Sequence, residues 1–174
     1  SGNSTIVLSF LYTVQSGDNS SDLDYKATDA LSTNSGTIRD NASNNATLTL
    51  ASPGASGSLG ANKAIVVDGI VPTVTNVSSS TDNGSYKIND NITVTVTFSE
   101  NVIVDNSSGN PRIQLAARSD NNSYANYVSG NSTSILSFLY IVQSGDNTTD
   151  LDYATTNSLS DNGSTIRDYA SNNA

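Results

Sequence analysis

Two stretches of this chain are nearly identical and lie 128 residues apart. Residues 1–46 align with residues 129–174 without a gap, and 33 of the 46 positions carry the same residue. The most distinctive part is SFLYTVQSGDNSSDLDY at residues 9–25, which returns as SFLYIVQSGDNTTDLDY at residues 137–153. A long internal repeat is typical of an array of similar domains. We therefore expect copies of one unit rather than a single irregular domain.

The repeat also predicts where one domain ends. The run VVDGIVPTV, residues 66–74, places Asp68-Gly69 and then Pro72 among apolar residues, as in a short link between β domains. We predict that residues 1–68 are the C-terminal part of one repeat, and that residues 69–174 are a repeat without its last strand. On this interpretation the chain is a segment of a longer tandem array. A boundary elsewhere, with a permuted unit, is the alternative, and a neighbouring chain could supply the missing strands.

Strand and turn formers dominate the composition. Ser and Thr make up 28% of the chain, Val and Ile lead the apolar residues, and Glu100 is the single glutamate, so amphipathic helices are not expected. The clearest strand is INDNITVTVTFSE, residues 88–100, in which apolar and polar residues alternate strictly. Such alternation indicates one buried and one solvated face. Residues 134–143 repeat the pattern.

Further strands are expected throughout both copies, and together they define the fold class. About seven short strands per unit, separated by turn signals, predict an all-β chain of immunoglobulin-like β-sandwich repeats in tandem. Tyr25 and Tyr153 are interpreted as core or corner tyrosines, and Arg39 and Arg167 as partners of adjacent acids. The remaining expected strands are 71–78, 101–105, 111–117, 124–129 and 164–168, with 37–40, 46–50 and 63–67 in the first copy.

The charge balance excludes some partners. Sixteen acidic residues against seven basic ones leave a net charge of −9, which disfavours nucleic acid. No apolar run approaches the ~18 residues of a membrane span, and no signal peptide opens the segment. Because the chain has no cysteine, small domains of this kind need another stabilising device.

Clustered aspartates suggest that device. The GDNSSDLDY loop carries three aspartates within seven residues, and all three recur in GDNTTDLDY. Carboxylates held ~4 Å apart repel by about 1 kcal/mol per pair even in water, and a hard divalent cation removes that cost. Calcium, with six to eight oxygen ligands, suits such a site, although the spacing is not that of an EF-hand. The alternative is that these residues cap their own turns.

Sandwich topology predicts which acids meet. The loop after SFLYTVQ and the link at Asp68 lie at the bottom of one domain, whereas Glu100 and Asp168 lie at the top of the next, with Asn172 as a further candidate. We therefore expect a cation clamp at each junction between neighbouring repeats. The candidate metal ligands are Asp18, Asp22, Asp24, Asp68, Glu100, Asp168, Asp40, Asp146, Asp150 and Asp152.

The chain is also rich in N-glycosylation sequons. Twelve Asn-x-Ser/Thr sites occur, against the six or so that random placement of 23 asparagines would give. Glycosylation and a merely turn-rich composition both explain the excess. The sites are Asn3, Asn19, Asn41, Asn45, Asn76, Asn83, Asn91, Asn106, Asn121, Asn131, Asn147 and Asn162.

Enzyme functions fit the residues poorly. The chain has no histidine for a general base and no cysteine for a nucleophile. A hydrolase would need a deep pocket with two carboxylates, and Glu100 is the only glutamate. We therefore expect no enzyme activity.

Several motifs, taken in order, resemble those of a known family. VVDGIVPTVTNVSSST, NITVTVTFSENVIV, VQSGDNTTDLDY and TIRDYASNNA are similar to the immunoglobulin-like and cadherin-like tandem repeats of large bacterial cell-surface adhesins, and the similarity covers nearly the whole chain. It implies an extracellular rod, often stiffened by calcium at its junctions. One motif departs from the family pattern D-x-A-G-N, because Ser43 and Ser171 stand at the glycine position.

These observations lead to two functional hypotheses. The first is a structural segment of an extracellular tandem-repeat protein at the cell surface or secreted from it, such as an adhesin stalk, a filament or a surface coat, in which other copies could be partners. The second is a β-sandwich module that binds a glycan or a cell-surface protein, with repeated copies supplying avidity.

Overall fold

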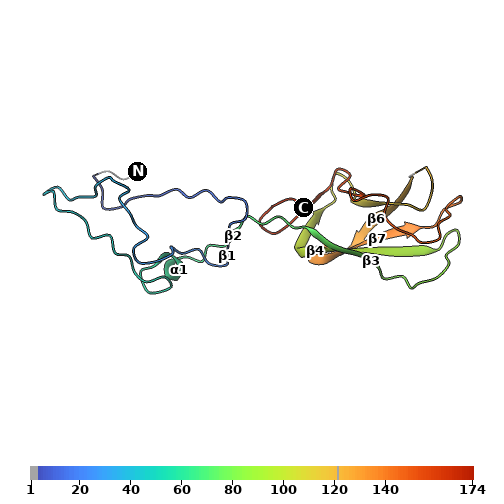
Figure 1. The fold of residues 1–174 in the computed structure, drawn as a ribbon, viewed down its shortest axis with the longest axis horizontal. Coiled ribbons are helices and arrows are strands. Elements are labelled where there is room, and N and C mark those ends of the chain that lie inside the picture. Colours follow the sequence, from blue (N-terminus) through green and yellow to red (C-terminus); the bar gives the residue numbers. More distant parts are fainter. Residues whose placement is uncertain (1–3, 121) are drawn as a thin grey trace. The chain divides into compact units, whose positions relative to one another are not determined.

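The computed structural model describes residues 4–120 and 122–174. The chain divides into two compact units, Ser1–Ile70 (unit 1) and Val71–Ala174 (unit 2), close to the boundary predicted after Asp68 (Figure 1). Two sequons, at Asn3 and Asn121, lie outside the described residues. Among the described residues, no helix is long and apolar enough to cross a membrane.

Unit 2 is an all-β fold with a sandwich-like arrangement, which confirms the predicted fold class. Its strands pair antiparallel in the order β3-β4-β7-β6-β5-β8, and β9 pairs with the far end of β4. The predicted strands of this unit form with ends shifted by a few residues, and β8 is an addition to them. The strands are β3 (Val74–Ser79), β4 (Asn91–Asp105), β5 (Arg112–Leu115), β6 (Ser123–Ser129), β7 (Thr133–Ile141), β8 (Leu159–Ser160) and β9 (Thr165–Arg167).

Strand β4 belongs to both layers of the sandwich. It merges the two strands predicted at residues 88–100 and 101–105, and its first part pairs with β3 and β7. The register shifts between Thr97 and Val102, and residues 103–105 then pair with β9. An irregularity of this kind bends a strand and re-aims its side chains, so one long strand can cross from one sheet to the other.

The core of unit 2 follows the alternation seen in the sequence. Val94, Val96 and Phe98 of β4 are buried, and Val94 lies opposite Phe138 of β7. The Phe138 ring meets the ring of Tyr127 edge to face, with centroids 5.9 Å apart. Side chains buried in this way contribute most of the stability of a small β domain.

Unit 1 does not form the strands that the sequence predicts. Residues 4–70 contain β1 (Asn19–Ser20), β2 (Val67–Asp68) and the short helix α1 (Leu59–Asn62), and β1 pairs with β2. The strands predicted at 37–40 and 46–50 are wrong, since only the isolated bridge between Arg39 and Asn45 forms there. Residues 6–14 also lack strand structure, although their counterparts form β7. A strand forms beside another strand that shares its backbone hydrogen bonds, and the two strands described in residues 4–70 pair with each other rather than with this segment.

Candidate metal site and the aspartate turns

Asp146 closes the turn that follows β7. Its carboxylate accepts hydrogen bonds from the Tyr140 hydroxyl and from the Gln143 backbone N–H at 2.6 Å. The Arg118 guanidinium also donates to it, from Nε at 3.1 Å, and a second nitrogen lies at 3.1 Å. Burial alone would raise the pKa of Asp146, but the hydrogen bonds from Tyr140, Gln143 and Arg118 outweigh it, and the pKa is lowered. The ionised carboxylate thus ties the turn to the sandwich.

Asp18 makes the same turn in unit 1. It accepts a hydrogen bond from the Tyr12 hydroxyl and another from the Gln15 backbone N–H at 2.6 Å, and the hydrogen bond from Tyr12, followed by that from Gln15, lowers the pKa of Asp18. The motif therefore forms in both copies, including the copy whose preceding segment is not a strand. The sequence signal of this turn is a tyrosine six positions before an aspartate, which the clustering of acids does not reveal.

Asp24 and its counterpart Asp152 bind neighbouring backbone. Asp24 accepts hydrogen bonds from the Tyr25 N–H at 2.9 Å and from the Gly54 N–H at 3.0 Å, beside helix α1. Burial opposes ionisation of Asp24, but the Gly54 and Tyr25 hydrogen bonds prevail and the pKa is lowered. Asp152 accepts one from the Tyr153 N–H at 2.8 Å. The contacts to Tyr25 and Tyr153 match the alternative in which the aspartates bond the backbone of their own turns, whereas Gly54 lies 30 residues from Asp24.

The loop triplets are therefore engaged separately rather than gathered around one point. Asp22 and Asp150 are exposed. Within residues 4–120 and 122–174, neither triplet forms a group whose carboxylate oxygens all approach one another closely enough for one ion. A ligand role for these six aspartates stays a prediction, and hydrogen bonds within their own turns account for part of the contacts of Asp18, Asp24, Asp146 and Asp152.

Asp40 and Asp168 close a second repeated turn. Asp168 accepts hydrogen bonds from the Asn172 N–H at 2.8 Å and from its Nδ2 at 2.7 Å, and Asp40 accepts the same pair from Asn44 at 2.8 and 2.9 Å. The turn places Ser171 at φ 74° and Ser43 at φ 68°. These are left-handed values, which a glycine adopts without strain and a serine does not.

Asp168 also lies next to Glu100. A carboxylate oxygen of Asp168 is within 4.8 Å of one of Glu100, and Asp168 is 1% exposed. Two features bring them together: Glu100 lies in the irregular part of β4 between Thr97 and Val102, and Asp168 directly follows β9, which pairs with the end of β4. Two carboxylates this close to each other, one of them buried, favour a cation.

The donor chemistry of this pair would suit a hard cation and does not select calcium over others. Each carboxylate oxygen of Asp168 accepts one hydrogen bond from Asn172 and has a second lone pair for a metal. Carboxylates, backbone carbonyls and amide oxygens are the ligands that calcium takes. The Arg167 guanidinium, adjacent in sequence to Asp168, lies 3.9 Å from Asp105 on β4. This arrangement corrects the expectation that Arg167 pairs with the acid next to it.

Arg39 and the two tyrosines that the sequence analysis interpreted as core or corner residues also differ in part from expectation. Arg39 donates to the Asn45 side chain at 2.9 Å rather than to an acid. The Tyr25 hydroxyl donates to the Ala51 carbonyl at 2.7 Å, 26 residues downstream, whereas a corner tyrosine bonds backbone a few residues upstream. Tyr153 is 40% exposed, so the core role predicted for it is wrong.

The ten sequon asparagines in the described part of the chain are all exposed. Some of their side chains nevertheless have structural contacts. The Asn131 Oδ1 accepts a hydrogen bond from the Val104 N–H at 2.8 Å, and the Asn162 Nδ2 donates to the Asn110 carbonyl at 3.1 Å. A glycan at Asn162 would be attached to the hydrogen-bonded nitrogen and leave it a single N–H, so that sequon is the less suitable acceptor of the two.

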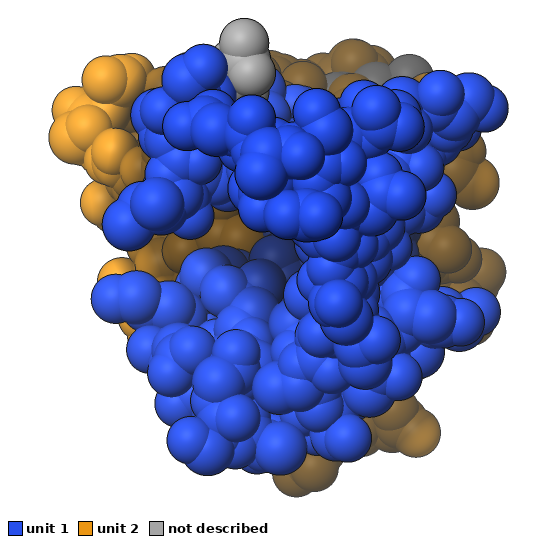
Figure 2. All heavy atoms as spheres, turned by 90° about the vertical axis from the view of Figure 1, so that its left-hand side faces the viewer, with its two compact units in different colours: residues 1–70 blue, residues 71–174 orange. Residues whose placement is uncertain are grey.

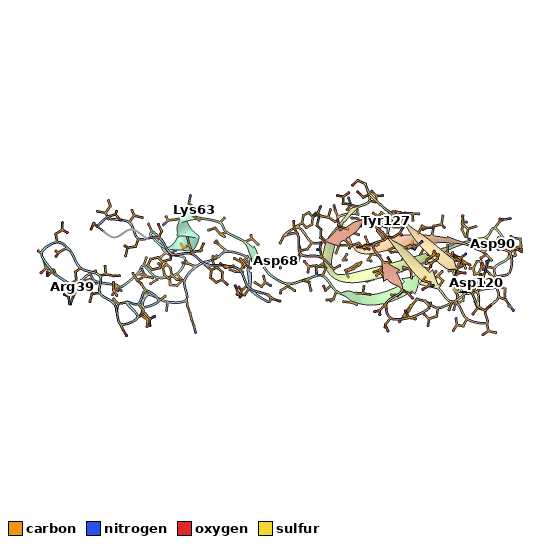
Figure 3. All side chains as sticks on the ribbon, turned by 90° about the horizontal axis from the view of Figure 1, so that it is seen from above. Arg39, Lys63, Asp68, Asp90, Asp120 and Tyr127 are labelled. Carbon is orange, nitrogen blue, oxygen red and sulfur yellow. The ribbon has the colours of Figure 1, made fainter. Side chains whose placement is uncertain are left out.

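A groove of about 800 Å³ opens at the end of unit 2 opposite Glu100 and Asp168. It lies between the β3–β4 loop, residues 81–86, and the loop at residues 146–153, over the apolar Val77, Ile92 and Val142. Asp90 and Asp120 also lie at this end (Figure 3). Aromatic rings of Tyr86 and Tyr153 contribute to its walls.

Comparisons with protein-family models, curated proteins and solved structures found no match. The resemblance to adhesin repeats therefore rests on the sequence motifs alone.

Proposed function

We propose that this chain is a structural segment of an extracellular tandem-repeat surface protein, an adhesin stalk, filament or coat, in which calcium stiffens the junctions between repeats. The observation that carries the proposal is the Glu100–Asp168 carboxylate pair. Asp68, at the end of unit 1, is the proposed third ligand.

Chain connectivity supports this choice of third ligand. Asp68 lies five positions before Thr73, and a fully extended chain spans at most roughly 3.6 Å per residue, so their Cα atoms are within about 18 Å of each other. Thr73 is hydrogen-bonded to Ser99, because its N–H donates to the Ser99 Oγ at 3.0 Å and its carbonyl accepts from the Ser99 N–H at 2.8 Å. Ser99 directly precedes Glu100, so Asp68 can reach the pair without unfolding either unit.

Calcium binding would explain why a chain without disulfides keeps this carboxylate pair. The ion would offset the repulsion between the two carboxylates and restrict the link that contains Gly69 and Ile70. A ligand that binds only the folded state stabilises it by about 2.7 kcal/mol when present at 100 times its Kd. The stabilisation would appear as a higher melting temperature and as a stiffer link.

The test is a melting and small-angle scattering experiment on the whole chain with calcium and with a chelator. We expect calcium at millimolar concentration to raise Tm and to narrow the range of particle dimensions, and we expect Glu100→Gln to remove both effects. Asp82→Asn, in an exposed loop of the same unit, is the charge-matched control and should keep the response. Equal Tm and equal scattering with calcium and with chelator would contradict the proposal.

The groove favours a second candidate, a module that binds a glycan. Tyr86 and Tyr153 line it together with polar loop residues, and sugar rings stack on aromatic side chains while their hydroxyls bind polar groups. A glycan screen of the whole chain would test this function. A hit that survives in chelator and is lost in Tyr86→Ala would favour it over the structural role.

A further inference from the structure

The tetrapeptide Asp-Asn-Gly-Ser occurs twice, in two different structural settings. It stands at residues 82–85, in the loop between β3 and β4, and at residues 161–164, in the turn between β8 and β9. Both copies belong to unit 2, whose atoms are orange in Figure 2. The long repeat does not account for them, because the first-copy counterpart of residues 161–164 is TNSG, at residues 33–36. The two sites therefore show how the structure alone changes the chemistry of an asparagine.

An asparagine followed by glycine can react with its own backbone. The glycine nitrogen attacks the side-chain Cγ of the asparagine, a C–N bond forms, the bond from Cγ to Nδ2 breaks, and ammonia leaves with the amide proton. Water then opens the resulting succinimide ring. Cleavage of the new bond leaves aspartate, whereas cleavage of the original peptide bond leaves isoaspartate, in which the main chain runs through the side chain. Glycine favours the first step because no Cβ hinders the approach of its nitrogen.

Asn83 and Gly84 are free to make this approach. Both are exposed, and neither forms a hydrogen bond with another residue in the described part of the chain. The Tyr86 hydroxyl donates to the Asp82 carbonyl at 2.5 Å, so the fixed contacts of this loop lie on either side of the pair. A Cβ built on Gly84 would meet the Tyr86 ring first, at 3.7 Å, which is an ordinary contact distance. The Asn83 side chain and the Gly84 peptide can therefore rotate without losing a contact of the fold.

Asn162 and Gly163 are held in place by the rest of unit 2. The Asn162 Nδ2 donates to the Asn110 carbonyl at 3.1 Å. The peptide also packs against Gly109, where an added Cβ would lie 2.0 Å from the Asn162 carbonyl oxygen and 2.8 Å from the Gly163 carbonyl carbon. Bringing the Gly163 nitrogen to the Asn162 Cγ requires rotation of both the side chain and the peptide. That rotation breaks the hydrogen bond and presses on Gly109, so the reaction has to wait for local opening.

We propose that Asn83 is a self-modification site, which converts to isoaspartate and aspartate in the folded chain, and that the structure protects Asn162 from the same reaction. Water is the co-reactant. Conversion adds a negative charge beside Asp82, and isoaspartate lengthens the main chain of the loop by a carbon atom. The reaction also removes the sequon at Asn83, so glycosylation and conversion are alternative fates of this side chain. The inference is independent of calcium and of the proposed structural role.

The test incubates the whole chain in mildly alkaline buffer, with and without denaturing urea. Peptide mass spectrometry follows each site, since conversion exchanges NH for O, and the isoaspartate and aspartate peptides separate by chromatography. In the folded chain we expect Asn83 to convert at least about tenfold faster than Asn162, which corresponds to a difference of about 1.4 kcal/mol in the barrier. In urea the two rates should become nearly equal, because the local sequence is the same and the protecting contacts are lost.

Gly84→Ala is the matched variant. It keeps the sequon, and the fold should accept it because Gly84 does not have a left-handed φ and its Cβ would make only an ordinary contact. The added Cβ hinders the backbone nitrogen, so conversion of Asn83 should slow by at least about tenfold while that of Asn162 stays the same. The inference would be overturned by equal rates at the two sites in the folded chain, by a faster Asn162, or by an unchanged rate in Gly84→Ala. Failure of Asn83 to convert in the folded chain, over a time in which the chain in urea converts, would also overturn it.

Discussion

Phe10 and Phe138 provide a direct test of how the surroundings of a side chain determine its contribution to stability. They occupy equivalent positions in nearly identical sequences, but Phe138 is 0% exposed between Val94 and Tyr127 whereas Phe10 is 74% exposed. We expect Phe138→Ala to lower the free energy of unfolding of unit 2 by about 3–5 kcal/mol, because it leaves a cavity in a closed core. Phe10→Ala should cost less than about 0.5 kcal/mol.

The free energy of unfolding of both variants is measured by urea denaturation of the whole chain, monitored by circular dichroism and by the amide signals of unit 2. For a unit of this size the dependence on urea is about 1–3 kcal/mol per molar, so a loss of about 4 kcal/mol lowers the midpoint by roughly 2 M. The loss of unfolding free energy in the double variant should equal the sum of the losses in the two single variants, since the residues belong to different units.

Either of two results would contradict these expectations. A loss above about 2 kcal/mol for Phe10→Ala would mean that residues 6–14 already bury this ring in a stable core. A loss below about 1 kcal/mol for Phe138→Ala would mean that the sandwich core described here does not hold unit 2 together.

Three further predictions concern the turns of unit 2. Ser171→Gly should raise stability by about 0.5–1 kcal/mol, because the left-handed φ of 74° strains any residue with a Cβ, and an unchanged or lower urea midpoint would count against this. The pKa of Asp146 is lowered in the folded state, so this carboxylate stabilises the fold fully above its unfolded pKa of about 3.9, and the stabilisation is lost as the pH falls below that value. The Asp146→Asn variant should therefore be less stable than the original chain at pH 7 and should lose less stability on acidification. Tm measured as a function of pH checks both expectations. Gly130→Ala should cost at least about 2 kcal/mol, since a Cβ there would lie 2.1 Å from the Ile135 carbonyl oxygen at φ 109°. The control Gly145→Ala, at φ 91° with nothing within 4 Å, should cost clearly less, and equal losses would contradict the clash.

Some features of the candidate site could be predicted from the sequence and others could not. The alternation in residues 88–100 indicated the buried face of β4, and topology indicated Glu100 and Asp168 as acids of one end. The engagement of Asp18 and Asp146 by tyrosine hydroxyls could not be derived from charge clustering, because clustering counts acids and ignores which donors the turn presents. Arg118, which helps to hold Asp146, lies 28 residues away and has no signal in the repeat.

The two turns are set by the local sequence alone. The Tyr–Asp turn joins residues six positions apart and the Asp–Asn turn joins residues four positions apart, and both form alike in the two units. Their donors and acceptors lie so close along the chain that the turn itself brings them together.

Strand formation in the repeated SFLY segment is decided by tertiary structure. Residues 134–142 form β7 between β4 and β6, whereas residues 6–14 do not form a strand. Backbone hydrogen bonds and apolar side chains of a strand are satisfied only by neighbours distant in sequence, and unit 1 lacks the segment that supplies them. The same physical reason places Glu100 beside Asp168, since only the pairing of β4 with β9 joins them.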